Sequence, residues 1–369
     1  MKILVTGADG FVGKNLLVRL NEIHDANVSK FLRGDSDEML LTKISSADIV
    51  VHLAGENRPR SNKDFDIGNR LMTQKICDIL GKLDRRTPLI LASSTQATLN
   101  NPYGKSKKAA ENSAIKLADK YQNPVAIYRL PGVFGKWSKP NYNSVVATFC
   151  HNIARDIDVE INSPKKKLEL VYIDDVISSF IDFIFGQPSG GALHYQVTPQ
   201  YTCTLEDLAA QISKFKNSRD TLITENVGMG FVRSLYSTYV SYLPIEKFHY
   251  KVECHSDDRG TFVEMLKTKD SGQFSYFTAH PGITRGGHYH HTKSEKFLVV
   301  KGTAEFRFRC IESNSKHSII TSCNESMIVE TIPGWAHDIT NIGEDEMIVM
   351  LWANEVFDRD KPDTIASKV

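Results

Sequence analysis

The sequence predicts an α/β part followed by an all-β part: a doubly wound parallel sheet within residues 1–245 and an antiparallel barrel or sandwich within residues 246–369. Three observations lead to this prediction. At 369 residues the chain is too long for one ordinary hydrophobic core. Up to about residue 217, short β-rich runs alternate with segments of helical spacing. After residue 250, short strands with period-2 alternation follow one another without long helical patterns.

In the first part, six β-rich runs are expected to form strands, and the longer segments between them are expected to form helices. The predicted strands are Lys2–Thr6, Asn27–Leu32, Asp48–Ala54, Pro88–Ala92, Pro124–Arg129 and Lys167–Ile173. Helical spacing is clearest in Phe11–Glu22, Asp64–Leu83 and Tyr103–Tyr121. Strand and helix alternation of this kind predicts a mainly parallel sheet with helices on both faces.

In the second part, seven short runs are expected to form an antiparallel structure. They are Thr261–Leu266, Gln273–Thr278, Lys296–Val300, Ala304–Phe308, Ser318–Thr321, Met327–Thr331 and Met347–Leu351. The stretch from about Asn217 to Tyr250 has neither pattern, so we interpret it as the connector, with the boundary placed after residue 245.

Composition narrows the classes of partner. Lys and Arg number 45 against 44 Asp and Glu, so the net charge of +1 gives no reason to expect nucleic acid or an anionic membrane as partner. No apolar run approaches the roughly 18 residues of a membrane span. Six cysteines without a CxxC pair are typical of free thiols in a reducing compartment. We therefore expect a cytoplasmic protein.

The first strand runs directly into a glycine-rich turn. Gly7, Gly10 and Gly13 have GxxGxxG spacing. An amphipathic helix is expected to begin at Phe11, with Val12 as its second residue. Glycines there allow a tight turn and let a pyrophosphate approach backbone N–H groups at the helix N-terminus. The strand before and the helix after make dinucleotide binding the favoured interpretation over a plain turn.

The end of the second strand bears on which dinucleotide is bound. An acidic residue there would bind the ribose 2′-hydroxyl of NAD, but this strand ends at Phe31-Leu32-Arg33. The guanidinium of Arg33 suits a 2′-phosphate, so NADPH is predicted as the cofactor, although an ordinary surface charge is the alternative.

Tyr103 and Lys107 are four residues apart at the start of a predicted helix, which places them on one face. An ammonium beside a phenol lowers the phenol's pKa, so the tyrosine could exchange a proton with a substrate oxygen. The pair follows a hydroxyl cluster at the end of the fourth strand, where Ser94 is the preferred partner of the reacting oxygen and Thr95 the alternative.

Up to about residue 245 the chain resembles the extended short-chain dehydrogenases/reductases that act on nucleotide sugars. The glycine motif, the segment His52 to Gly55, the hydroxyl cluster and the YxxxK pair occur in the expected order. The resemblance implies a Rossmann-type sheet and an acid/base role for Tyr103, with Lys107 tuning it and holding the nicotinamide ribose. It also adds Leu53 and Ala54 to the cofactor-binding residues.

The second part contains a histidine cluster. His288 and His290 alternate as i and i+2 on one face of a strand, and Glu295 and His337 could complete a set of nitrogen and oxygen ligands for zinc or another divalent metal. The spacing from Gly282 onward matches the first cupin motif, G(x)5HxH(x)4E(x)6G, and the second motif is matched in part around His337. The resemblance implies a metal-binding cupin barrel.

A second interpretation uses the same residues differently. Arg285-Gly-Gly-His288 also resembles deoxysugar epimerases of the cupin class, in which the arginine contacts the nucleotide phosphate and the histidine is a general base rather than a ligand. His291, outside the HxH pattern, is another candidate base, with an exposed loop histidine as the plain alternative. The sequence leaves these assignments open.

A 4-keto nucleotide sugar connects the two predicted chemistries, because its ketone acidifies the neighbouring C3–H and is also reducible by hydride. With the segments 136–145 and 361–364, the whole chain resembles the bifunctional capsular-polysaccharide enzymes that epimerise and reduce a UDP-linked 4-keto-6-deoxy-N-acetylhexosamine. The resemblance implies zinc, a homodimer and a 6-deoxy-L-talosamine product. The alternatives are a reductase with a non-catalytic, dimerising cupin and a non-catalytic sugar-nucleotide sensor.

Overall fold

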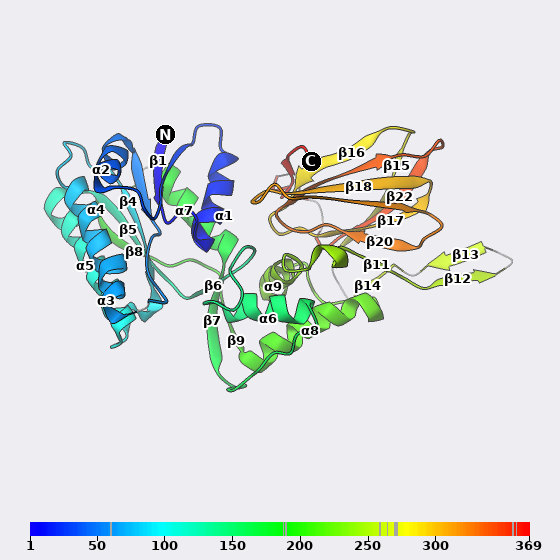
Figure 1. Ribbon diagram of the computed structural model, residues 1–369, viewed down its shortest axis with the longest axis horizontal. Helices are drawn as coiled ribbons and strands as arrows, with labels where there is room; N and C mark the ends of the chain where they lie inside the picture. The colour runs from blue at the N-terminus through cyan, green and yellow to red at the C-terminus, as the bar shows by residue number, and fades with distance from the viewer. Residues whose placement is uncertain are drawn as a thin grey trace. The chain divides into compact units, whose positions relative to one another are not determined.

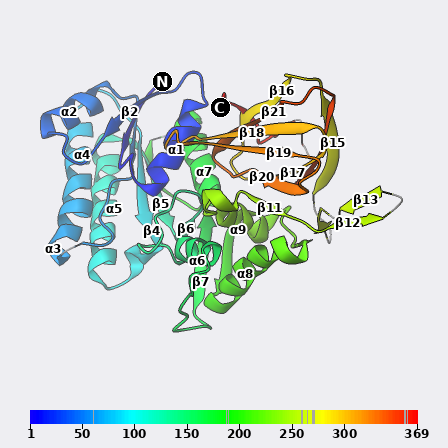
Figure 2. The same ribbon diagram turned by 45° about the vertical axis from the view of Figure 1, so that its right-hand side comes forward.

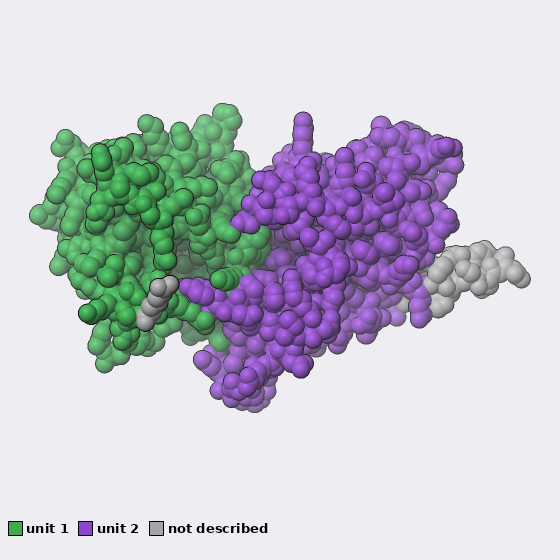
Figure 3. All heavy atoms as spheres, in the orientation of Figure 1, with its two compact units in different colours: residues 1–139, 168–202 green, residues 140–167, 203–369 purple. Residues whose placement is uncertain are grey.

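The computed structural model describes residues 1–369 except 60, 187, 189, 258, 259, 264, 269–271, 356, 357 and 359. For residues 254–257, 260–263 and 273 it describes the backbone only. The chain packs into two compact units, residues 1–139 with 168–202 and residues 140–167 with 203–369 (Figure 3). The boundary expected after residue 245 stays a prediction, because packing alone does not show which segment folds by itself.

A six-stranded parallel sheet forms the centre of the first unit. Its order is β2-β1-β3-β4-β5-β8, and every neighbouring pair is parallel. The strands are β1 (Lys2–Thr6), β2 (Asn27–Phe31), β3 (Ile49–His52), β4 (Leu89–Ser94), β5 (Pro124–Leu130) and β8 (Gly191–Tyr195). The first five confirm predicted strands to within a few residues. The predicted doubly wound sheet is therefore present.

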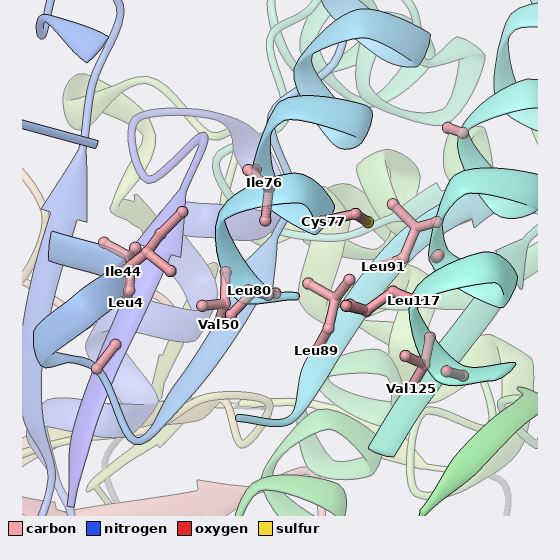
Figure 4. Close-up of a cluster of buried hydrophobic side chains, with 14 of the residues drawn as sticks. Leu4, Ile44, Val50, Ile76, Cys77, Leu80, Leu89, Leu91, Leu117 and Val125 are labelled. Atoms are coloured by element: carbon pink, nitrogen blue, oxygen red, sulfur yellow. The ribbon is translucent and has the colours of Figure 1, made fainter. Parts of the chain in front are cut away.

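Helices cover both faces of this sheet (Figure 1). One face carries α2 (Asp37–Ser46), α4 (Met72–Leu80) and α5 (Pro102–Tyr121), and the other carries α1 (Phe11–Asn21) and α7 (Ile173–Phe185). Apolar side chains of α2, α4 and α5 pack on the strands in a buried cluster (Figure 4). The predicted helix Asp64–Leu83 is instead divided into α3 (Asn62–Phe65), a π-helical segment (Asp66–Leu71) and α4.

The predicted strand Lys167–Ile173 forms, but outside the main sheet. As β7 (Lys167–Tyr172) it lies between β6 (Gly132–Phe134) and β9 (Gln200–Thr204) in a separate three-stranded sheet. Periodicity identifies a strand but not its neighbours, so this pairing could not be predicted.

Three helices of the second unit, α6 (Val145–Ala154), α8 (Leu205–Thr221) and α9 (Gly230–Val240), pack against one another. The last of them lies within the stretch interpreted as a connector. Its residues from Ser234 to Val240 are all buried, so this stretch is part of the core of its unit. None of the helices in the described ranges is long and apolar enough to cross a membrane.

Two five-stranded antiparallel sheets form the C-terminal part (Figure 2). One has the order β11-β20-β17-β22-β15 and the other β19-β18-β21-β16-β23. The predicted runs correspond to β15 (Gln273–Ala279), β17 (Glu295–Lys301), β18 (Thr303–Cys310), β19 (Lys316–Ser322), β20 (Met327–Glu330) and β22 (Met347–Ala353). The predicted strand Thr261–Leu266 overlaps β13 (Gly260–Val263), and its residue 264 lies outside the described residues.

The strands β11 (His249–Lys251), β21 (Trp335–Asn341) and β23 (Ile365–Ala366) were not predicted. The strand expected to carry His288 and His290 forms as β16 (Thr284–Tyr289), which contains His288 and ends just before His290. Positive backbone φ angles at Gly286 and Gly287 accompany a bulge in β16, which obscures the period-2 pattern there. Two antiparallel sheets of this kind form the expected cupin fold.

Candidate functional site

The glycine turn after β1 has no room for larger side chains. Gly7 has φ +69°, and a Cβ on it would lie 2.6 Å from the backbone nitrogen of Ala54. A Cβ on Gly13 would lie 2.3 Å from the carbonyl oxygen of Gly7. Helix α1 begins at Phe11, directly after Gly10, and no side chain caps its N-terminus. The predicted cradle for a pyrophosphate is thus formed by backbone atoms.

The segment after β3 is held beside this turn. The Thr6 hydroxyl accepts a hydrogen bond from the backbone N–H of Ala54 at 3.2 Å and contacts Nδ1 of His52 at 2.7 Å. Nε2 of His52 lies 2.9 Å from the Thr73 hydroxyl. Burial lowers the pKa of His52 to about 3, so this imidazole is a neutral bridge that fixes the backbone at Leu53 and Ala54.

The order of strands makes this edge of the sheet suitable for a ligand. The chain leaves β1 for β2 on one side and returns to β3 on the other side, so the connections diverge at the carboxyl ends of β1 and β3. Such a switch point is where doubly wound sheets bind ligands. Gly7, Gly10 and Ala54 lie there.

Arg33 lies two residues after β2 with 94% of its side chain exposed. Its guanidinium is 3.2 Å from the Glu56 carboxylate. Glu56 is held in turn by Asn69, whose side-chain oxygen accepts from the Glu56 N–H at 3.0 Å. The Arg33 side chain is therefore exposed to solvent, and its ion pair with Glu56 orients the guanidinium.

Tyr103 lies in the first turn of α5. Asn101 caps this helix by accepting a hydrogen bond from Gly104 N–H at 2.7 Å, and Pro102 occupies the first helical position. Burial raises the pKa of the Tyr103 phenol, and a hydrogen bond with Ser94 acts in the opposite direction. The structure thus brings Ser94, the preferred hydroxyl, to Tyr103.

Burial has the largest effect on the Tyr103 phenol and raises its pKa, so a lowering by Lys107 stays a prediction. Lys107 is buried, and its Nζ donates to the carbonyl oxygen of Ala92 at 2.6 Å. Burial lowers the pKa of Lys107 to about 8, with Glu111 opposing this effect. The ammonium also lies near Gly55, where a Cβ would be 3.8 Å from Nζ.

Glu111, one turn after Lys107 on α5, was not identified from the sequence. Its fully buried carboxylate accepts hydrogen bonds from Ser93 at 2.6 Å and from Arg129 at 2.6 and 2.8 Å. Burial would raise the pKa of Glu111, but these hydrogen bonds hold it at about 2. The carboxylate joins α5 to β4 and β5 directly beside Ser94.

The four predicted metal ligands gather in the C-terminal sheets. One ligand atom each from His288, His290, Glu295 and His337 lies within 4.8 Å of the others. His288 and His337 are paired across β16 and β21 of one sheet, whereas Glu295 begins β17 of the other. The Glu295 carboxylate lies 3.1 Å from Nε2 of His290 and 3.3 Å from Nε2 of His337. The cluster therefore bridges the inner faces of the two sheets.

The charges of this cluster fit a divalent cation. Burial lowers the pKa of His288 to about 3, and burial also lowers the pKa of His337. Burial would raise the pKa of Glu295, but the close imidazoles of His290 and His337 hold it well below its ordinary value. Neutral imidazoles and an ionised carboxylate are the forms that bind zinc or a similar metal.

His291 and Arg285 lie apart from this cluster. The ring of His291 contacts the ring of Tyr289, with centroids 5.5 Å apart, and its backbone N–H donates to Asp363. His291 is buried in the bend after β16 and is not an exposed loop histidine, and its role as the base stays a prediction. Arg285 is exposed on β16 with its guanidinium 5.1 Å from the Phe277 ring centroid.

Two family models match the chain. Residues 3–195 match the NAD dependent epimerase/dehydratase family, and residues 255–365 match the polysaccharide biosynthesis C-terminal domain. Together with the glycine cradle, the Tyr103 site and the cupin cluster, these matches define a short-chain dehydrogenase/reductase joined to a cupin.

Full-length relatives share this combination. A UDP-2-acetamido-2,6-beta-L-arabino-hexul-4-ose reductase of Pseudomonas aeruginosa is 54% identical over 369 residues, which are 100% of this chain and 99% of the relative. The structure of the capsular polysaccharide assembling protein CapF of Staphylococcus aureus is 41% identical, with full coverage of both chains and a TM-score of 0.69. The chain belongs to this family of capsular-polysaccharide enzymes.

A likeness at lower identity concerns the fold alone. The UDP-glucuronic acid 4-epimerase of Bacillus cereus is 17% identical over 59% of this chain and 83% of that chain, with a TM-score of 0.52. It supports the assignment of the Rossmann-type sheet.

Proposed function

We propose that this protein is a bifunctional enzyme that inverts C3 of a UDP-2-acetamido-2,6-dideoxy-4-hexulose and reduces its C4 ketone with NADPH. The product is UDP-N-acetyl-6-deoxy-L-talosamine, a precursor of UDP-N-acetyl-L-fucosamine in polysaccharide biosynthesis. The observation that carries the proposal is that the chain holds two separate sets of reactive side chains, one around Tyr103 and one around Glu295. The name of the Pseudomonas relative supports the 4-keto substrate and the reductase half.

In the reductase site, Tyr103 is the group that gives a proton to the C4 oxygen. NADPH, when bound on the glycine cradle, supplies the hydride. Ser94, which is hydrogen-bonded to Tyr103, is the proposed second hydroxyl that binds the ketone oxygen, and this contact supports the assignment. Lys107 is directed to the same edge of the sheet, where it can hold the nicotinamide ribose, and Arg33 is exposed to receive a 2′-phosphate.

In the epimerase site, His288, His290, Glu295 and His337 would hold a divalent metal, for which zinc is the proposed choice. A bound ion there would polarise the C4 ketone and increase the acidity of the C3–H. His288 is the most exposed of the four, so it faces the side from which a sugar can enter. Arg285 is the proposed partner of the UDP diphosphate, and its exposure three residues before His288 supports this role.

The reductase half is tested by mixing the enzyme, NADPH and the UDP-4-keto sugar, followed by NMR of the product. NADPH oxidation and a C4 alcohol are expected. If no NADPH is oxidised, the reductase role is contradicted and the non-catalytic sensor becomes the favoured alternative. NADH in place of NADPH should react more slowly, and an Arg33→Ala variant should reduce that difference.

The epimerase half is tested by solvent exchange without NADPH. In deuterated water, deuterium is expected at C3 with the wild-type enzyme and with a Tyr103→Phe variant. No exchange by the wild type would favour the reductase with a non-catalytic cupin. Removal of the metal by a chelator should stop exchange while NADPH binding continues.

Two histidine variants separate a ligand from a base. If His288 is a ligand, His288→Ala should lose both metal and exchange, whereas a base would lose exchange alone. His291→Ala is expected to keep its metal, and its exchange rate decides whether the predicted base role survives. A homodimer and a cytoplasmic location belong to the same proposal, and sedimentation and cell fractionation test them.

A further inference from the structure

The last residues of the chain run along β16, the strand that carries His288 and ends just before His290. Ile365 and Ala366 form β23, which pairs antiparallel with β16 so that Ala366 lies opposite His288 and Ile365 opposite Tyr289. One residue further, the N–H of Ser367 donates to the carbonyl oxygen of Gly287 at 2.8 Å. The C-terminal segment is therefore part of the sheet at the cluster.

Asp363, just before β23, holds the loop between His290 and Glu295. Its Oδ1 accepts from the backbone N–H of His291 at 2.9 Å. Its Oδ2 accepts from the backbone N–H groups of Thr292 and Lys293 and from the Thr292 hydroxyl, each at 2.9 Å. One carboxylate thus satisfies three successive N–H groups and fixes the path of the loop.

The backbone of Asp363 also orients a predicted ligand directly. Its carbonyl oxygen lies 2.6 Å from Nδ1 of His290. A carbonyl only accepts, so Nδ1 carries the hydrogen and Nε2 is left as the lone-pair nitrogen. That Nε2 lies 3.1 Å from Glu295, inside the cluster. Hydrogen bonds of this kind set the tautomer and ring direction of metal-binding histidines.

We propose that Asp363 is a positioning residue of the metal site: its carboxylate and its carbonyl together fix His290 and the loop that leads to Glu295. This inference rests on the metal site in the proposed function. It gives the C-terminal segment a role in metal affinity, although this segment is 26 residues beyond His337, the last residue of the ligand set.

The test compares zinc affinity in the full-length wild type, Asp363→Ala, Asp363→Asn and the control Asp360→Asn. Asp360 is exposed, lies three residues earlier and undergoes the same change of charge. Affinity is measured by competition with a chromophoric chelator, and cobalt substitution reports the ligand geometry by visible absorption. Circular dichroism and thermal unfolding of each variant show whether the unit that contains Asp363 is folded.

Asp363→Ala is expected to bind zinc about 10- to 100-fold more weakly, as is usual when a group supporting a ligand is removed. Asp363→Asn, which keeps the shape but provides fewer acceptors, should lose less, and Asp360→Asn should match the wild type. The cobalt spectrum should change in Asp363→Ala. If Asp363→Ala does not fold, Asp363→Asn carries the comparison.

The outcomes separate the inference from the proposal beneath it. A wild type that binds no zinc or cobalt overturns the metal site itself. A wild type that binds zinc, with Asp363 variants of equal affinity and unchanged cobalt spectra, overturns the positioning role alone. If the Asp363 variants lose the same thermal stability with and without metal, and their zinc affinity is unchanged, Asp363 is a purely structural residue. That result also overturns the positioning role.

Discussion

Tyr103 is a half-buried phenol whose pKa is raised by this burial, so it carries its proton at neutral pH. A proton donor has to be protonated before reduction, and this setting meets that requirement. The adjacent Phe65 ring, with its centroid 5.5 Å from that of Tyr103, fixes the direction of the phenol. Removing the hydroxyl therefore removes the proton but little of the packing.

We expect Tyr103→Phe to lower the rate of ketone reduction by about 10²- to 10⁴-fold, the usual contribution of a general acid. NADPH binding should change little, because the ring remains. The measurement is steady-state NADPH oxidation with the 4-keto sugar, alongside fluorescence titration of NADPH. Tyr121→Phe, at the exposed end of the same helix, is the matched control and should react at the wild-type rate.

Lys107 gives a pH dependence with a definite sign. Burial lowers its pKa to about 8, so the ammonium is lost as the pH rises through that value. Because the charge is the useful form, kcat/KM for NADPH should fall above about pH 8. This parameter reports groups of the free enzyme. Lys107→Arg keeps its charge at high pH and should move the fall upward, whereas an unchanged profile would contradict the assignment.

At the scale of elements, Glu111 connects α5, which carries Tyr103, to the strands that end beside it. The fully buried carboxylate is paired with Arg129, whose side chain is 30% exposed. Removing one partner of such a pair leaves an uncompensated charge. The attachment of α5 to β4 and β5 is thus the element-level support of the reductase site.

Glu111→Gln should destabilise the protein by about 3 kcal/mol at neutral pH. The folded-state pKa of Glu111, about 2, is below its ordinary value of 4.5, so this stabilisation is complete above pH 4.5 and is lost as the pH falls toward 2. Urea midpoints of wild type and variant, measured at a series of pH values, should therefore converge below pH 4.5. A constant difference would mean that the Glu111 charge contributes nothing.

Strand β17 shows why some elements were predicted only in part. Its first five residues are all buried, including Lys296, because helices cover its outer face. There the Tyr236 hydroxyl of α9 donates to Glu330 at 2.8 Å, and Lys296 Nζ donates to the Tyr250 hydroxyl at 3.0 Å. Period-2 alternation is expected when one face of a strand is exposed to water. The first five residues of β17 are buried on both faces, so they show no such alternation.

At the scale of the whole molecule, each unit contains one complete set of reactive residues. Tyr103, Lys107 and Ser94 all belong to the first unit, whereas the four cluster residues belong to the second. A substitution in one set of residues should therefore leave the activity of the other set unchanged. The two activities are expected to be separable by mutation.

A mixture of Tyr103→Phe and His337→Ala should form the C3-inverted, C4-reduced sugar that neither variant forms alone. The Tyr103→Phe enzyme supplies the epimerised ketone, and the His337→Ala enzyme reduces it. Product NMR after mixing is the measurement, with each variant alone as control. Failure of the mixture, with both single activities present, would indicate that the intermediate does not pass through solvent.

The sequence by itself determined the fold class and most of the candidate site residues. Glycine spacing after a strand, a YxxxK pair at a helix start and an HxH pattern are short-range features, so they can be recognised within about ten residues. The structure brings Ser94, the preferred of two candidate hydroxyls, to Tyr103, and it brings the four cluster residues together.

Only the tertiary structure decided the direction of the Tyr103 pKa shift and the partners of Glu111. It also decided the position of His291 and the hydrogen bonds from Asp363 to the loop between His290 and Glu295. These properties depend on burial and on contacts between residues as far as 73 positions apart, as for His290 and Asp363. Local periodicity contains no information about such contacts, because the free energy of a buried charge depends on whichever distant groups the fold brings to it.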